Sequence, residues 1–140
     1  MVYSLDVYNY LVSLEKGERL LEALEQFVRE AKIEGAWVSG LGGALEMTLG
    51  FYDLDKKEYK WQTFEGLHEI MNLTGNIAFD EQGKLITHLH GVFGDRQYNT
   101  KGGHVKDLTA AATVELFVHR INKPLKRKLN SEIGLPLLDL

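Results

Sequence analysis

Short apolar runs separated by turn-forming residues dominate this sequence, and they constrain its fold more than any other feature. The runs are rich in Val, Ile, Tyr, Phe and Thr, which favour strands. Consecutive strands joined by short turns form antiparallel sheets. The predicted strands lie at residues 3–14, 35–41, 45–53, 58–64, 69–79, 84–93 and 113–120, with a short closing strand within residues 134–138. The predicted turns lie at residues 53–57, 75–76, 80–83, 94–95 and 101–103.

One segment, between Gly17 and Lys32, has helical periodicity instead. Its apolar residues are Leu20, Leu21, Leu24, Phe27, Val28 and Ala31. This spacing of three and four places them in one stripe along a helix. We therefore expect an α+β fold in a single domain over residues 1–140, with a mostly antiparallel sheet and one main helix packed on it.

The composition limits the classes of protein that this chain can represent. A hydrophobic share of 44% and a charged share of 26% are typical of a globular domain. Because no apolar run approaches about 20 residues and the N-terminus lacks the features of a signal peptide, we expect a cytoplasmic protein without a membrane partner. The absence of cysteine excludes disulfides and thiolate ligands, so a transition-metal site would need histidines and carboxylates.

The histidines form the sharpest local pattern. His88 and His90 project from the same face of their predicted strand, about 7 Å apart along it. The segment that follows is long enough to turn back and bring His104 to the same place, and the two glycines before His104 let the backbone pass closely. Three neutral imidazoles suit Zn²⁺ or a similar divalent ion, with a fourth position left to water or a ligand. We therefore predict a metal site formed by His88, His90 and His104.

Other interpretations of the histidines stay open. Two histidines on a half-exposed strand can simply be surface residues. The cupin metal motif also begins with His-x-His, but it requires a Glu four residues after the second His, where this sequence has Gly94. His68 and His119 lie at the ends of predicted strands, and we expect both at the surface or in an interface.

Two further clusters have simple interpretations. Residues 40–43, Gly-Leu-Gly-Gly, lack the spacing and the following helix of a phosphate-binding loop, so we expect a tight turn with close backbone packing. Residues 123–128 concentrate four positive charges, which could contact phosphates or form a solvated surface. The net charge of -4 favours the solvated surface and weak or absent binding to duplex DNA.

Several short motifs, in this order and spacing, resemble the plants-and-prokaryotes-conserved (PPC) domain, the family related to the domain of plant AT-hook nuclear proteins. The resemblance covers nearly the whole chain. The motifs are Gly17-Glu18, Gly40-Leu41-Gly42-Gly43, Gly50-Phe51-Tyr52-Asp53, residues 69–77, His88-Leu89-His90, Gly102-Gly103-His104, Thr113-Val114-Glu115 and Gly134-Leu135-Pro136-Leu137.

This resemblance implies an antiparallel sheet flanked by helices, and a homotrimer. Prokaryotic members resemble metal-binding proteins with three histidine ligands, which correspond here to His88, His90 and His104. DNA binding in the plant members belongs to the AT-hook, whose Arg-Gly-Arg-Pro core is missing from this sequence. An association with DNA is thus an expectation taken from the family rather than from a residue.

Two functions follow as hypotheses. The first is a homotrimeric module that binds a divalent metal, zinc, and serves in binding or regulation, with DNA as a candidate partner. The alternative is a small metal-dependent enzyme whose open coordination position activates water or polarises a substrate oxygen, with Glu69 or Glu115 as general base. A carboxylate within hydrogen-bond reach of the metal site would favour the enzyme.

Overall fold

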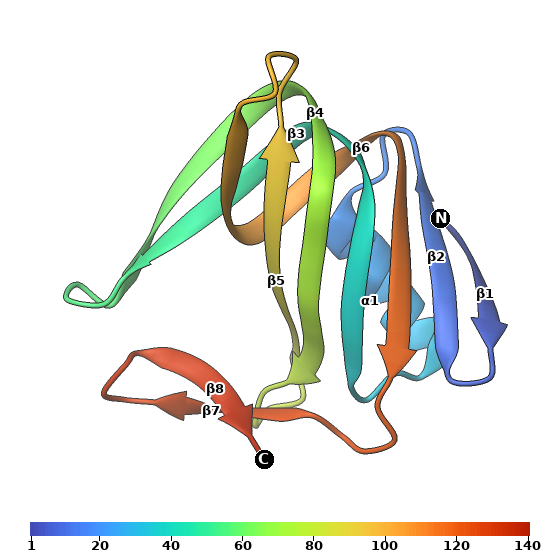
Figure 1. Ribbon diagram of the computed structural model, residues 1–140. Helices are drawn as coiled ribbons and strands as arrows, with labels where there is room; N and C mark the ends of the chain where they lie inside the picture. The colour runs from blue at the N-terminus through green and yellow to red at the C-terminus, as the bar shows by residue number, and fades with distance from the viewer.

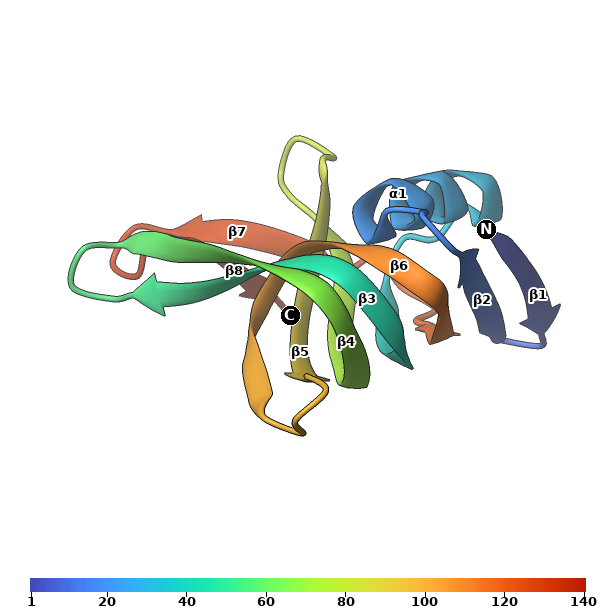
Figure 2. The same ribbon diagram turned by 90° about the horizontal axis from the view of Figure 1, so that it is seen from above.

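The computed structural model describes residues 1–140, except for the side chain of Asp6. A strongly curved sheet makes up most of this chain, and helix α1 packs against one of its faces (Figure 1, Figure 2). The elements in chain order are β1 (Val2–Asp6), β2 (Asn9–Glu15), α1 (Leu20–Ala31), β3 (Ala36–Asp53), β4 (Glu58–Phe79), β5 (Leu85–Gly94), β6 (Thr100–Arg120), β7 (Lys126–Asn130) and β8 (Leu135–Asp139). Among the described residues, no helix has both the length and the apolar character that crossing a bilayer requires.

The pairing of the strands brings distant segments together. The strand order is β1-β2-β6-β3-β4-β7-β8, and β5 pairs with both β4 and β6. Strands β3, β4, β5 and β6 therefore pair in a closed antiparallel circuit. The first part of β6 lies beside β5, and its last part lies between β2 and β3. Strand β6 therefore connects the part of the sheet around β5 with the part around β2.

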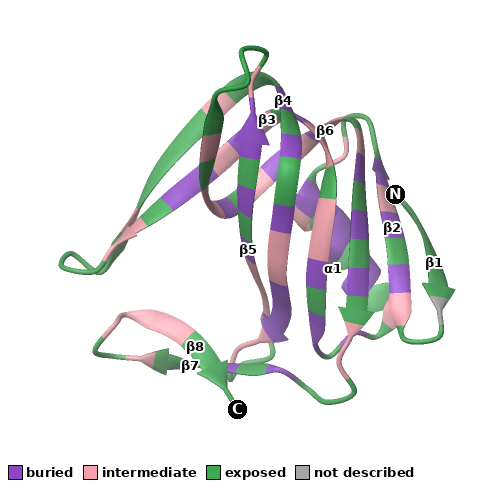
Figure 3. Cartoon of the chain, in the orientation of Figure 1, coloured by how far each residue is buried: buried purple, intermediate pink, exposed green. Residues whose placement is uncertain are grey.

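The helix predicted between residues 17 and 32 is confirmed as α1. Its buried stripe consists of Leu20, Ala23, Leu24, Phe27 and Val28. Figure 3 shows buried positions on α1 and, facing it, on the strands of the sheet. Phe27 meets the rings of Tyr10 and Tyr3 edge-on, with ring centroids 5.1 and 5.2 Å apart. The core therefore lies between α1 and the inner face of the sheet.

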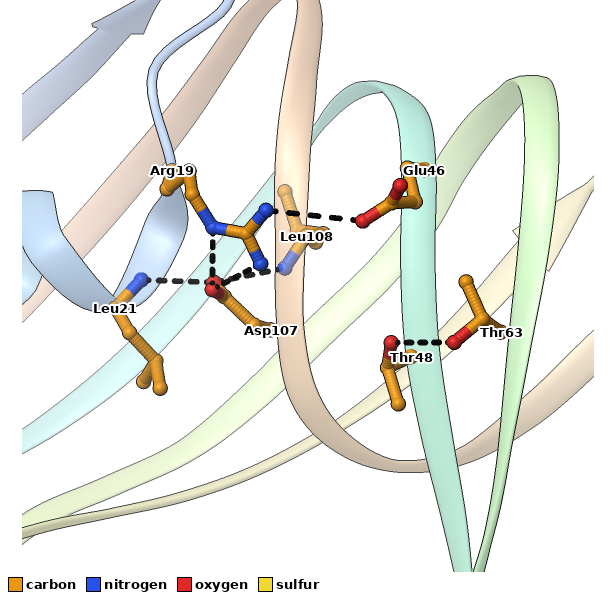
Figure 4. Close-up of polar contacts among 7 residues, drawn as sticks. All are labelled: Arg19, Leu21, Glu46, Thr48, Thr63, Asp107 and Leu108. Atoms are coloured by element: carbon orange, nitrogen blue, oxygen red, sulfur yellow. Dashed lines mark hydrogen bonds and ion pairs between the residues drawn. The ribbon is translucent and has the colours of Figure 1, made fainter.

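A residue of β6 holds the start of α1. Arg19, at the N-cap, makes no side-chain capping bond of its own. Instead, the Asp107 carboxylate accepts a hydrogen bond from the Leu21 N–H at 3.0 Å and two from the Arg19 guanidinium, at 2.7 and 2.9 Å (Figure 4). A carboxylate at a helix N-terminus is stabilising because it satisfies free N–H groups and complements the helix dipole. Asp107 thus joins the helix to the sheet.

The expectation of a sheet flanked by helices is wrong. Within the described part of the chain α1 is the one helix, and it covers one face only. The predicted strand over residues 3–14 is a hairpin of β1 and β2, which turns at Val7 with a φ of +55°. The predicted closing strand near the C-terminus is confirmed as β8, which pairs with β7.

Three glycine-rich segments that predict turns lie inside strands instead: residues 40–43 in β3, 75–76 in β4 and 101–103 in β6. The physical reason is close approach of neighbouring strands. A Cβ added to Gly42 would collide with the Thr113 carbonyl oxygen of the adjacent strand. The close backbone packing expected at residues 40–43 is therefore present, but the tight turn expected there is wrong.

The sheet face opposite α1 exposes large apolar side chains. Leu11, Leu41, Met71 and Phe117, which we call the outer apolar patch, are between 43% and 63% exposed. They come from four different strands and line a groove of about 750 Å³. Apolar groupings of this kind on a surface mark interaction sites.

Candidate metal centre

The structure brings His88, His90 and His104 together on the face of the sheet that carries the outer apolar patch. His88 and His90 flank the buried Leu89 on β5, so their rings leave the strand on the same face. His104 lies on β6, directly opposite His90 in the antiparallel pairing of the two strands. One ring nitrogen from each histidine lies within 4.8 Å of the other two.

The spacing of His88 and His90 fits two ligands of a tetrahedral divalent cation. Zinc–nitrogen bonds of about 2.0–2.1 Å place two ligand nitrogens about 3.4 Å apart. Nε2 of His88 and Nε2 of His90 are 3.3 Å apart. His104 Nδ1 is buried and finds no hydrogen-bond partner among the described atoms, which marks the ring as available to a ligand. The donor set of three imidazoles therefore suits zinc.

Burial keeps two of the rings neutral. It lowers the pKa of His104 from its usual 6.5 to about 4, with smaller contributions from the neighbouring histidines. Burial also lowers the pKa of His88, assisted by the positive charge of Arg127. The rings of Tyr59 and Trp61 cover His104, with centroids 4.9 and 5.9 Å from its own. Since a metal binds the neutral imidazole, both rings are in the binding form at neutral pH.

Arg127 is a residue of this site that sequence reasoning missed. Its side chain belongs to the basic cluster at residues 123–128, but strand β7 turns it inward, to 5% exposure, and leaves Lys126 and Lys128 in solvent. The guanidinium lies 3.1 Å from His88 Nδ1. The interpretation of the cluster as a solvated surface is thus wrong for Arg127. The alternation with the buried Leu125, two residues earlier, was the available signal.

The two candidate general bases lie away from the histidines. Glu69 is five residues from Thr74, the partner of His90 on β4, which corresponds to about 17 Å along the strand. Glu115 is eleven residues from His104 on β6 and lines the groove of the outer apolar patch. No Asp or Glu joins the three histidines among the described side chains. Neither of the two carboxylates named by the enzyme hypothesis thus lies beside the histidines.

The other two histidines also lie apart from the site. His119 is exposed, as expected, and its Nδ1 is 2.6 Å from the side-chain oxygen of Asn9. His68 is buried, so its expected place at the surface of the chain is wrong. The ring folds back on its own strand because Gly66, with a φ of +85°, presents its carbonyl oxygen 2.9 Å from His68 Nδ1.

Comparison with solved structures shows the same architecture in proteins from several prokaryotes. A protein from Ralstonia eutropha is 34% identical, with a TM-score of 0.91, and the match covers 99% of this chain and 95% of that one. A protein from Bacteroides thetaiotaomicron is 30% identical, with a TM-score of 0.93 and coverage of 99% and 96%. Both are named a "putative DNA-binding protein". A metal-containing protein from Archaeoglobus fulgidus is 26% identical, with a TM-score of 0.86 and coverage of 100% and 99%.

No functionally curated protein matches this sequence. The model of one protein family does, over residues 3–122, and its description is the Plants and Prokaryotes Conserved (PCC) domain. This match spans most of the chain, including α1, the closed circuit of strands and all three clustered histidines. The resemblance predicted from the sequence is therefore confirmed, and the chain belongs to the Plants and Prokaryotes Conserved domain family.

Proposed function

We propose that this protein is a homotrimeric module that holds a divalent metal, zinc, on His88, His90 and His104 and serves in binding or regulation. The observation that carries the proposal is the convergence of three ring nitrogens within 4.8 Å of one another on two paired strands. The name of the Archaeoglobus fulgidus protein, metal-containing, supports it. Zinc bound there would tie β5 to β6 and supply a Lewis-acidic position open to a ligand.

A binding role is favoured over catalysis by the surroundings of the histidines. General acid–base chemistry needs a titratable group within about 3 Å of the reacting atoms, or one water away. Glu69 and Glu115 both lie too far along their strands. The nearest charged neighbour in hydrogen-bond contact with the cluster is Arg127, a permanent donor that cannot act as a base.

Metal binding is tested on chelator-treated protein by elemental analysis after reloading and by thermal unfolding with and without zinc. Zinc at a hundredfold excess over its dissociation constant adds about 2.7 kcal/mol to the free energy of unfolding. For a domain of 140 residues, this raises the melting temperature by about 9 °C. Alanine at His88, His90 or His104 should remove the response, whereas His119→Ala should keep it. Wild-type protein that melts identically with and without zinc, and retains none, contradicts the proposal.

The outer apolar patch supports self-association, and the number of three copies is what the family resemblance implies. The four side chains of the patch would be covered if copies of this chain packed there, and burial of apolar surface drives such association. Sedimentation equilibrium should give three times the mass of 15.9 kDa. Phe117→Lys should shift the mass towards the monomer because it places a charge in the groove, and Leu54→Lys, at an exposed turn away from the patch, should not. A wild-type monomer at micromolar concentration contradicts the trimer.

A further inference from the structure

Arg127 is a buried cation without a counter-ion. Its Nη1 donates a hydrogen bond to the Pro136 carbonyl oxygen and its Nη2 to the Asn76 side-chain oxygen, both at 2.8 Å. Among the described residues, no carboxylate lies within the 4.0 Å of an ion pair, and Nε is buried without any partner. A buried charge of this kind is costly unless an opposite charge accompanies it. No side chain of the described residues therefore compensates the buried charge of Arg127.

The contact between Arg127 and His88 changes character when a metal is present. His88 Nε2 faces His90, and Nδ1 faces the guanidinium. In the metal-free protein Nδ1 can accept a hydrogen bond from Arg127. With a metal on Nε2, the neutral ring carries its one proton on Nδ1. Two donors then face each other across 3.1 Å: the Nδ1–H of His88 and the second N–H of Arg127 Nη2, whose first N–H donates to Asn76. Each of them needs an acceptor.

Metal-binding histidines usually donate their second ring N–H to a carboxylate, a backbone carbonyl or water. At His88 the neighbour in that position is a guanidinium, which can only donate. A divalent cation at the histidines would also place two further positive charges close to Arg127. Among the described side chains, no carboxylate belongs to the histidine group to balance them. An anion that accepts from both groups would resolve the donor conflict and the charge excess together.

We propose that the site binds a small oxyanion together with its metal, and that Arg127 recognises this anion. The class is a carboxylate or a tetrahedral oxyanion, because the planar fork of donors on arginine matches both. The inference rests on the proposed metal binding, and it adds the chemical class of the ligand. Tyr59, which packs on His104, and Asn76, which holds the guanidinium, would border the anion.

The test measures zinc affinity by calorimetry in a buffer without oxyanions, and again with acetate or with sulfate, corrected for their weak binding to free zinc. Because coupling between two ligands is reciprocal, an anion that binds with the metal must tighten zinc binding. We expect at least one of the two anions to increase the affinity about tenfold. Arg127→Met should still bind zinc but lose this increase, and Lys126→Met, on the same strand and exposed, should keep it.

The outcomes separate this inference from the proposed function. If zinc binds but neither anion changes its affinity, the anion site is refuted and the metal site stands. If zinc binds in none of the buffers, the metal site itself is refuted. If Arg127→Met responds to the anions as the wild type does, recognition by Arg127 is refuted. If Arg127→Met does not fold, the wild-type titration and Arg127→Lys are used in its place. Arg127→Lys should show a smaller increase in zinc affinity with the anions than the wild type does, and an equal increase refutes recognition by Arg127.

Discussion

The lowered pKa of His104 predicts how the free energy of unfolding of the metal-free protein changes with pH. This pKa is lowered from 6.5 to about 4, first by burial and then by the neighbouring charges of His88, His90 and Arg127. In the unfolded chain the ring is exposed and takes up a proton near its usual pKa. Between these two pH values the unfolded state therefore binds more protons than the folded state. The free energy of unfolding must fall as the pH decreases from 6.5 towards 4, and the contribution of His104 is complete above 6.5.

The size of this effect follows from the shift in pKa. A change from 6.5 to about 4 in a fully buried group would correspond to about 3 kcal/mol. Because the His104 ring is only partly buried, screening by solvent reduces this value, and we expect about 1.5 kcal/mol. For a chain of 140 residues, that loss lowers the melting temperature by about 5 °C.

The assay is urea unfolding and thermal unfolding of chelator-treated protein between pH 7.5 and 4.5. His104→Gln removes the titrating ring, so its free energy of unfolding should decline less with falling pH than that of the wild type. His119→Gln, which replaces an exposed histidine away from the site, is the control. If His104→Gln and the wild type decline with the same slope, the reasoning about His104 is wrong. Because a metal binds the neutral imidazole, the lowered pKa values of His88 and His104 lead us to expect that the protein retains the metal below the usual histidine pKa of 6.5.

Three further predictions concern the start of α1, Gly42 in β3 and the basic cluster. Asp107→Asn should lower the free energy of unfolding in urea by about 1–2 kcal/mol because it removes the charge that holds the start of α1; the same loss in 1 M salt and in dilute buffer would contradict a charge effect. Gly42→Ala, with φ at +138° and a carbonyl oxygen in the way, should destabilise by more than 1 kcal/mol; unchanged urea unfolding would refute this. Duplex DNA binding measured by fluorescence anisotropy should be weak, and Lys126→Gln with Lys128→Gln should lower its log–log salt slope by about 0.9 for each lost contact; tight binding that survives both changes would contradict the expectation.

The helix and the existence of most strands could be predicted because they depend on local periodicity. The stripe from Leu20 to Val28 is complete within one segment, so no partner is needed to recognise it. The same applies to the alternation that puts His88 and His90 on one face. The inward position of Arg127 belongs to this class too, since β7 alternates with the ordinary period of two. Because arginine is rarely buried, a prediction from the sequence leaves the Arg127 side chain in solvent despite this alternation.

Strand length and capping could not be predicted, since both depend on residues far away in the sequence. The glycines at residues 40–43 and 75–76 lie inside strands, where Gly42 and Gly75 let the neighbouring strand approach more closely than a side chain would allow. From the local sequence alone, the same glycines predict turns. Likewise, the group that caps α1 is Asp107, more than eighty residues after the helix begins, and no pattern around Arg19 indicates it.

The meeting of His90 with His104 depends on the register of one hairpin. The turn between β5 and β6 is held by Asp95, whose backbone N–H donates to the Asn99 carbonyl oxygen at 3.0 Å and whose side chain accepts from the N–H groups of Gln97 and Asn99 at 2.9 and 3.0 Å. A slip of one residue in this pairing would turn the His104 side chain to the opposite face of the sheet. The sequence contains the three histidines and the Asp95 turn signal, but only the turn's exact length makes them one site. The clustering of the three histidines therefore depends on the Asp95 turn as well as on the histidines themselves.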